Sequence, residues 1–348
     1  MKIDEFKEQM YTRSGKERLS SHLESMYGIR VKQLTELDLG VFRVDRHDGL
    51  TWIARLFSKA MPVKRVQGDA EILRFLEQQG YPAERCAHPN AVSLHEEQPV
   101  LVTNYVHGTK PKGSVKAFYF LGVLLGRLHT LPVTLGSMAR EGGAWHHLSL
   151  QGGPREEIEA ALSLLMGSEQ IVPEEQRLLY ETLLDELKQS DDFREMPQAL
   201  IHPDFVPTNM IKVDVGKWAV IDWTGAGRGS RISSLGFLLW AAGLRGDLQC
   251  VDAVVAGYRK YINLESEELA RLSSAIRTRP VIFDCWALCM GRKGLVDAVQ
   301  GVSETREITK AISIRAVQAL RANMTHESRT HMKGSPCSKE NANKLFTY

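Results

Sequence analysis

The stretch LIHPDFVPTNMIKVDVGKWAVIDWTGAG, from Leu200 to Gly227, places four polar residues close together among apolar, strand-like runs. These residues are His202, Asp204, Asn209 and Asp222. Four such groups within one short segment are either unrelated surface residues or parts of a chemical site. Their spacing, and the elements that carry them, decide between these two interpretations.

The run MIKVDVGKWAVIDW predicts a β-hairpin that turns at Asp214–Lys217. Such a hairpin brings Asn209 and Asp222, which flank its two strands, back to neighbouring positions. Asp204, which precedes the hairpin, would lie one turn away. An amide oxygen and a carboxylate are hard ligands that suit Mg²⁺. A further carboxylate nearby can accept or orient the proton of a hydroxyl group, so the segment predicts a phosphoryl-transfer site.

The composition is that of a globular protein that binds neither nucleic acid nor membranes. The chain has 348 residues, of which 43% are hydrophobic and 25% charged, enough for a sizeable core in two lobes. Its net charge of +2 is too small to indicate nucleic acid or an anionic membrane as a partner. The charged N-terminus lacks a signal sequence, and the five cysteines are scattered, so we expect a cytoplasmic protein. The oligomeric state stays open.

Residues 1–106 predict an N-terminal lobe with a small antiparallel sheet. The first 28 residues are helical in pattern, with Phe6, Met10, Leu19, Leu23 and Met26 as face residues. The strands VFRV and TWIARLF are joined through an Asp-Gly pair, which favours a hairpin. VQGDAEILRFLEQQGY then predicts a helix. AVSLHEEQPVLVTNYV predicts two further strands that turn at HEEQ.

Residues 107–323 predict a mostly helical C-terminal lobe. AFYFLGVLLGRLHTLP is a strongly apolar helix, and residues 155–190 hold one or two amphipathic helices. Beyond the hairpin, separate helices are expected in SSLGFLLWAAGL, CVDAVVAGYRKYI, ELARLSSAIRT and VIFDCWALCMG. Residues 324–348 are polar and aperiodic, which is typical of a flexible tail. The fold class expected from the whole pattern is α+β.

The order His-x-Asp, four residues, then Asn, followed by an Asp at the next hairpin strand, resembles the catalytic and metal-binding loops of the aminoglycoside phosphotransferase and choline kinase family. TWIARLF resembles the third strand of that family, PVLVTNYVHG its hinge, and LGVLLGRLHTLP the helix before its catalytic loop. The resemblance covers residues 30–290. It implies a two-lobed, protein-kinase-like fold and a small-molecule kinase.

The resemblance also implies a role for each matching residue of the catalytic segment. Asp204 matches the catalytic base, and His202 matches the residue that supports the catalytic loop. Asn209 and Asp222 match the two metal ligands, which implies Mg²⁺ as the cofactor.

In the N-terminal lobe, Arg55 falls where the family has a lysine, or sometimes an arginine, that contacts the α- and β-phosphates of ATP or GTP. Glu71 matches its ion-pair partner. Asn104, Tyr105 and Val106 match the hinge, where backbone groups hold the adenine.

This chain departs from the family at several positions. Gly40 is the only glycine between the first two strands, which makes a short and poor phosphate-covering loop. Arg55 offers a planar fork where a lysine offers a point charge. Pro203 and Thr208 stand where the family more often has glycine. Arg55 also fits an exposed strand arginine, and Glu71 a solvated helix residue.

We therefore expect Mg²⁺-dependent transfer of the γ-phosphoryl group of ATP or GTP to a hydroxyl of a small molecule, such as an antibiotic, a sugar or an amino alcohol. The alternative is a pseudokinase-like protein that binds a nucleotide or ligand, because the glycine-poor loop and Arg55 disfavour fast turnover. A kinase of proteins is disfavoured, since only WTGAGRGSRIS separates Asp222 from the next helix. Residues 233–300 show no clear acidic excess, so a neutral or amphipathic acceptor is as well supported as a polycationic one.

Overall fold

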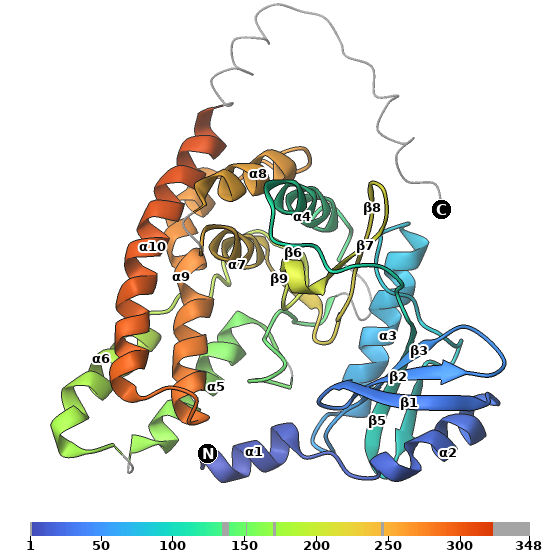
Figure 1. Cartoon of the computed structure of the whole chain (residues 1–348). Helices are drawn as coiled ribbons and strands as arrows, with labels where there is room; N and C mark the ends of the chain where they lie inside the picture. Colours follow the sequence, from blue (N-terminus) through green and yellow to red (C-terminus); the bar gives the residue numbers. More distant parts are fainter. Residues whose placement is uncertain (1, 134–138, 151, 170–171, 245–246, 323–348) are drawn as a thin grey trace, which may run out of the picture.

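The computed structural model describes residues 2–133, 139–150, 152–169, 172–244 and 247–322, and it has two lobes (Figure 1). The tail predicted at residues 324–348 lies outside the described residues. The smaller lobe contains a five-stranded antiparallel sheet in the order β1-β2-β3-β5-β4. Its strands are β1 (Val31–Asp38), β2 (Val41–Arg46), β3 (Trp52–Leu56), β4 (Val92–His95) and β5 (Gln98–Asn104).

The alternation of strand β3 decides which of its side chains reach the space between the lobes. Trp52, Ala54 and Leu56 are buried in the core of the sheet. Because successive side chains of a strand point to opposite faces, Ile53 and Arg55 lie on the other face. The hairpins that align these strands form as predicted. At the β4–β5 turn, Glu96 and Glu97 both have positive φ values, 50° and 66°.

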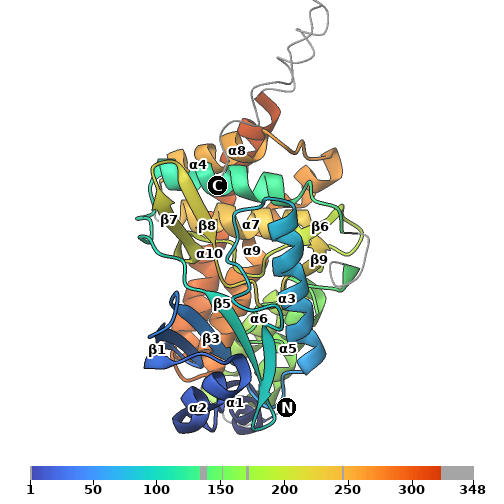
Figure 2. The ribbon, with the colours of Figure 1, turned by 90° about the vertical axis from the view of Figure 1, so that its right-hand side faces the viewer.

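Helix α3 (Val63–Gln78) packs on the sheet along β5, as Figures 1 and 2 show. The segment that follows it ties the two lobes together. The hydroxyl of Tyr81 donates to the carbonyl of Leu124 at 3.0 Å. The amide of Glu84 donates to the carbonyl of Val220 at 3.0 Å. One hydrophobic core therefore runs from the sheet into the larger lobe, and Glu84 is carried towards the site described below.

The larger lobe is mostly helical, with two short antiparallel pairs of strands. Its helices are α4 (Val115–Leu128), α5 (Pro154–Gly167), α6 (Arg177–Lys188), α7 (Arg231–Gly243), α8 (Leu248–Tyr258), α9 (Ser266–Cys289) and α10 (Leu295–Ala322). Its strands are β6 (Gln198–Ile201), β7 (Met210–Asp214), β8 (Lys217–Val220) and β9 (Gly227–Ser230). Strand β7 pairs with β8, and β6 pairs with β9. No helix within the described part of the chain is long and apolar enough to cross a membrane.

Two sequence expectations for this lobe were wrong. ELARLSSAIRT and VIFDCWALCMG are one helix, α9, which continues through Pro280. A proline inside a helix removes one backbone hydrogen bond, but burial on several sides can outweigh that loss, and α9 packs against α5, α6, α7 and α10. The segment WTGAGRGSRIS, expected only to separate Asp222 from the next helix, contains strand β9 with the sequence GRGS.

The N-terminal residues form two helices, which attach to different parts of the molecule. In α1 (Ile3–Tyr11), Phe6 and Met10 enter a second hydrophobic core together with residues of α5, α6 and α9. In α2 (Lys16–Tyr27), Leu19 and Leu23 enter the core of the sheet lobe. Met26 is 49% exposed, so the expectation that it faces the core was wrong. By its packing, α1 goes with the helical lobe, although it precedes the sheet in the sequence.

Candidate active site

The loop between β6 and β7 is held in place by a buried histidine. His202 is 2% exposed, and its Nδ1 accepts a hydrogen bond from the amide of Asp204 at 3.0 Å. With Nδ1 accepting, Nε2 carries the proton and donates to the carbonyl of Ile221 at 3.0 Å. Burial lowers the pKa of His202 to about 4, so the ring is neutral near pH 7. His202 thus joins the loop of Asp204 to the segment of Asp222.

Asp204 and Asn209 form one hydrogen-bonded unit. Nδ2 of Asn209 donates to the Asp204 carboxylate at 2.8 Å and to its carbonyl at 3.0 Å. Since both bonds use the amide nitrogen, Oδ1 of Asn209 stays available to accept a hydrogen bond or to bind a metal ion. Burial raises the pKa of Asp204 to about 6, while Arg279 opposes the shift.

Asp222 follows strand β8 in a left-handed backbone conformation, with φ at 68°. Its carboxylate pairs with a guanidinium nitrogen of Arg55 at 2.9 Å. Burial alone would raise the pKa of Asp222, but Arg55 and the nearby histidines, His146 first among them, lower it to about 2. Asp222 therefore stays ionised over the whole physiological pH range, as a metal-binding carboxylate needs to be.

Glu84 is a buried carboxylate at this site that sequence reasoning missed. Its two oxygens accept hydrogen bonds from the hydroxyl of Thr103 at 2.9 Å and from the amide of Asp222 at 2.7 Å. Burial raises its pKa, and Arg55 opposes that shift. No local pattern marks Glu84, because only the pairing of its segment with β8 brings it here.

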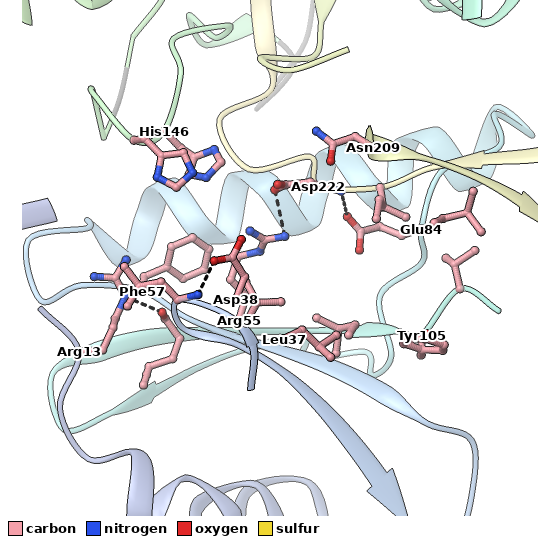
Figure 3. Close-up of a pocket in the computed structure, with 18 of the residues that line it drawn as sticks. Arg13, Leu37, Asp38, Arg55, Phe57, Glu84, Tyr105, His146, Asn209 and Asp222 are labelled. Carbon is pink, nitrogen blue, oxygen red and sulfur yellow. Dashed lines mark hydrogen bonds and ion pairs between the residues drawn. The ribbon is translucent and has the colours of Figure 1, made fainter. Parts of the chain in front are cut away.

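A pocket of about 320 Å³ lies between the lobes and contains most of the predicted site residues. It is lined by Arg55, Asn104, Tyr105, Val106, Asn209 and Asp222, among others. Figure 3 shows Tyr105 at one end, the Arg55–Asp222 pair in the middle, and Arg13 with His146 at the other end. Asp204 and His202 lie outside the residues that line the pocket, and Asn209 connects Asp204 to it.

Glu71 is exposed on α3 and does not line the pocket, so its predicted pairing with Arg55 needs correction. The acid that α3 buries is Asp69, which is 0% exposed and lies with Arg55 around a small cavity. Asp69 pairs with Arg140 and accepts a hydrogen bond from the amide of Gly225 at 3.1 Å. It therefore ties α3 to the turn that follows Asp222. The helical spacing from Asp69 to the buried Leu73 and Leu76 is the signal that could have identified it.

Arg279 of α9 fastens the loop of Asp204 to the helical lobe. It donates to the carbonyls of Pro203 at 2.7 Å and Gly143 at 2.8 Å. Its Nε also lies 2.8 Å from the carboxylate of Glu157 in α5. Because Glu157 is 2% exposed, the guanidinium is held between two helices, and its charge acts on Asp204 from a fixed position.

Comparisons with known proteins identify the family and the fold of this chain. Residues 35–272 match the phosphotransferase enzyme family. A solved amicoumacin kinase, in complex with AMP-PNP, Ca²⁺ and Ami, is 17% identical with a TM-score of 0.61, and the match covers 88% of this chain and 96% of that chain. The choline kinase LicA from Streptococcus pneumoniae is 15% identical with a TM-score of 0.57, covering 83% and 99% of the two chains.

A microcompartment-associated aminopropanol kinase is 17% identical with a TM-score of 0.56, covering 86% of this chain and 99% of that one. At such identities the solved structures establish the fold, which confirms the two-lobed, kinase-like α+β architecture. A comparison with curated protein sequences gave no match. Since the family match spans well over half of the chain, this protein belongs to the phosphotransferase enzyme family, and the prediction of a kinase is confirmed.

Proposed function

We propose that this protein transfers the γ-phosphoryl group of a nucleoside triphosphate, ATP or GTP, to a hydroxyl group of a small molecule. The observation that carries the proposal is the position of Asn209. It hydrogen-bonds the Asp204 carboxylate and lines the same pocket as Asp222 and Arg55. A group able to accept a proton and groups able to hold phosphate and metal thus meet in one place, as phosphoryl transfer requires.

In the proposed reaction, Asp204 accepts the proton of the acceptor hydroxyl. The hydroxyl oxygen forms a bond to the γ-phosphorus, the bond from that phosphorus to the β-phosphate oxygen breaks, and the nucleoside diphosphate leaves. A pKa of about 6 suits this role, because such a carboxylate is ionised at pH 7 and is more basic than an exposed aspartate. His202 and Arg279 support Asp204 by fixing its loop.

The residues present fit Mg²⁺ as the cofactor. Asp222 is ionised, and Oδ1 of Asn209 is left as a neutral oxygen ligand. In the described part of the chain, no group of three or more His, Cys, Asp or Glu side chains is arranged to hold a metal ion. A magnesium ion would therefore take its remaining ligands from phosphate and water. Such an ion would neutralise the negative charge of the phosphates. Arg55 would then contact the phosphates in place of part of its contact with Asp222.

The expected hinge, residues 104–106, leaves fewer backbone amides available to a nucleobase than expected. The amide of Asn104 already donates to the carbonyl of Arg85 at 2.8 Å, and that of Tyr105 to the carbonyl of Thr51 at 3.0 Å. The amide of Val106 takes part in no backbone hydrogen bond between described residues. We therefore propose that Val106 donates to the base and that the carbonyls of this segment accept from it.

The acceptor is proposed to be a small molecule with a free hydroxyl group. The solved relatives include kinases named for amicoumacin, choline and aminopropanol. Chemically, these range from an antibiotic to small amino alcohols, which is the range that the sequence leaves open. The alternative, a pseudokinase-like binding protein, is favoured by one observation: the Arg55–Asp222 ion pair occupies the proposed metal ligand.

A two-step experiment tests the proposal. Binding of ATP and of GTP is measured by calorimetry with and without Mg²⁺, and we expect Mg²⁺ to tighten the binding. A panel of antibiotics, sugars and amino alcohols is then scored by release of nucleoside diphosphate. Binding without any acceptor-dependent release would favour the pseudokinase-like alternative. The absence of nucleotide binding would exclude both nucleotide-dependent readings.

We also propose a cytoplasmic location. Cys86, Cys250, Cys285 and Cys289 are all free thiols, three of them buried, as is usual in a reducing compartment. Cell fractionation of the tagged protein tests this point. Recovery in an oxidising compartment would contradict it.

A further inference from the structure

Arg13 reaches the active-site pocket from outside both lobes. It lies in the short connection between α1, which packs on the helical lobe, and α2, which packs on the sheet lobe. Its side chain nevertheless lines the pocket together with Arg55 and Asp222. Figure 3 shows it beyond the Arg55–Asp222 pair, at the end of the pocket that is remote from Tyr105.

The guanidinium of Arg13 is held rigidly on one side only. Its Nε donates to the carbonyl of Leu56 at 2.8 Å, and its Nη1 donates to the carbonyls of Met10 and Thr12, each at 3.0 Å. None of the hydrogen bonds between described residues uses Nη2. An arginine carries five N–H donors, so two donors on a fixed, planar group stay available to a ligand.

Arg13 is also without an ion-pair partner in the part of the chain that the structure describes. No carboxylate among the described residues forms an ion pair with it, whereas Arg55 pairs with Asp222. Burial lowers the pKa of Arg13 to about 10, so the group is still a cation at pH 7. A partly buried cation without a partner is costly, and a bound anion in the same pocket would relieve that cost.

The turn between β1 and β2 lies directly against this cation. A Cβ added at Gly40 would come within 3.0 Å of Nε of Arg13. This turn lines the pocket with Asp38 and Leu39, but its amides are already used: that of Leu39 donates to the carboxylate of Asp38 at 2.7 Å and that of Gly40 to the carboxylate of Glu36 at 3.2 Å, so neither is left for phosphate oxygens. A guanidinium can supply the missing hydrogen bonds, because its planar fork matches two oxygens of one phosphate.

We propose that Arg13 binds the terminal phosphates of the nucleotide and so replaces the missing glycine-rich loop. This inference rests on the proposed function, since it needs a nucleotide in the pocket. The direction of the nucleotide follows from the order of groups in Figure 3. With the base at the hinge near Tyr105 and the α- and β-phosphates at Arg55, the chain of phosphates points towards Arg13.

The test compares nucleotides that differ only in their phosphates. Affinities for Mg²⁺–ATP, ADP and AMP are measured by calorimetry for the wild type, Arg13→Gln and Arg13→Lys. Loss of a charge-assisted contact should weaken ATP binding by about 10- to 100-fold in Arg13→Gln, with AMP changed by less than about 2-fold. Arg13→Lys should recover part of the loss. The matched control is Arg18→Gln, an exposed arginine of α2 that pairs with Glu96 outside the pocket.

The outcomes separate this inference from the function on which it rests. If the wild type binds no nucleotide, the proposed function fails, and the role of Arg13 fails with it. If the wild type binds ATP but Arg13→Gln weakens ATP and AMP equally, Arg13 only holds the structure together and the inference is overturned. Unchanged ATP binding in Arg13→Gln, or a higher KM for the acceptor alone, would also overturn it.

Discussion

At the scale of single residues, Asp204 and Asp222 are two aspartates of one site whose pKa values shift in opposite directions. Burial acts in the same sense on both, and it raises the pKa of Asp204 to about 6. In Asp222, the ion pair with Arg55 and the nearby histidines outweigh burial and lower the pKa to about 2. One carboxylate is therefore tuned to exchange a proton near neutral pH, and the other to stay charged.

The first prediction is a pH profile. A general base acts only when it is deprotonated, so kcat/KM should rise with pH through about 6 and then level off. Arg279 lowers the pKa of Asp204, so Arg279→Gln should move the rise to higher pH, while Arg279→Lys keeps it near the wild-type position. Steady-state rates between pH 5 and 8 measure this. A profile that is flat, or that Arg279→Gln leaves in place, would contradict the assignment.

The two aspartates should also separate in kinetics. Asp204→Ala removes the proposed proton acceptor, so kcat should fall by at least about 100-fold while nucleotide affinity stays nearly intact. Asp222→Ala removes the proposed metal ligand, so the affinity for Mg²⁺–ATP itself should fall. Calorimetry and steady-state rates on both variants check this. Near wild-type turnover in Asp204→Ala would remove Asp204 from the catalytic role.

How far the site was predictable from sequence depends on how local each contact is. Asp204, Asn209 and Asp222 lie within one loop and one hairpin, so their meeting follows from spacing and turn geometry. Glu84 lies 138 residues before Asp222, and only the pairing of its segment with β8 joins them. Arg13 comes to the pocket through two helices that pack on different lobes. Such long-range contacts leave no local pattern.

At the scale of elements, the backbones of α4 and α8 lie close together, because glycines form the contact between the two helices. A Cβ added at Gly122 would lie 2.2 Å from the carbonyl oxygen of Val254, and one added at Gly257 would lie 2.2 Å from that of Tyr119. The atoms in the way belong to the backbone, which cannot rotate aside. This contact positions α4, which packs against β6 and against the turn Pro207–Asn209.

We predict that Gly122→Ala destabilises the protein. Alanine in a helix gains up to about 1 kcal/mol over glycine, but overpacking against the backbone costs about 1–3 kcal/mol or more, so the clash should win. Denaturant unfolding measures the net change. The matched control is Gly113→Ala, where the nearest atom to an added Cβ is a side-chain carbon of Phe118 at 3.5 Å. If Gly122→Ala is as stable as this control, the contact between α4 and α8 tolerates a side chain at residue 122, and the prediction is wrong.

The elements that sequence reasoning missed share a physical cause. Two separate helices were expected on the two sides of Pro280, yet α9 continues through it because neighbouring helices surround it. Helix α10 was not expected as an element, since small and polar residues interrupt its apolar positions. The residues it buries include Ala298, Thr305, Thr309 and Ser313. In both cases tertiary packing stabilises a helix that local preference describes poorly.

At the scale of the whole molecule, the N-terminal segment spans the cleft on the side away from the hinge. Tyr11 donates its hydroxyl hydrogen to the carbonyl of His147 at 2.8 Å and accepts a hydrogen bond from Trp286 at 2.9 Å, so the end of α1 is fixed to the helical lobe. Two residues later, Arg13 bonds to Leu56 of the sheet lobe. The chain thus crosses between the lobes twice, at this segment and at the hinge, and residues of both crossings line the pocket.

The last prediction tests this second connection by a substitution at a residue that does not line the pocket. Phe6 of α1 is 1% exposed and lies in the second hydrophobic core. Phe6→Ala should therefore lower the packing contribution to the free energy of unfolding by about 3–5 kcal/mol. Helix α1 should then detach, and its amide hydrogens should exchange faster. Because Arg13 loses its support, the affinity for ATP should fall more than the affinity for AMP. The control is Leu178→Ala in α6, whose side chain is 75% exposed. Faster exchange in α1 with unchanged ATP affinity would show that the segment does not hold Arg13 in place.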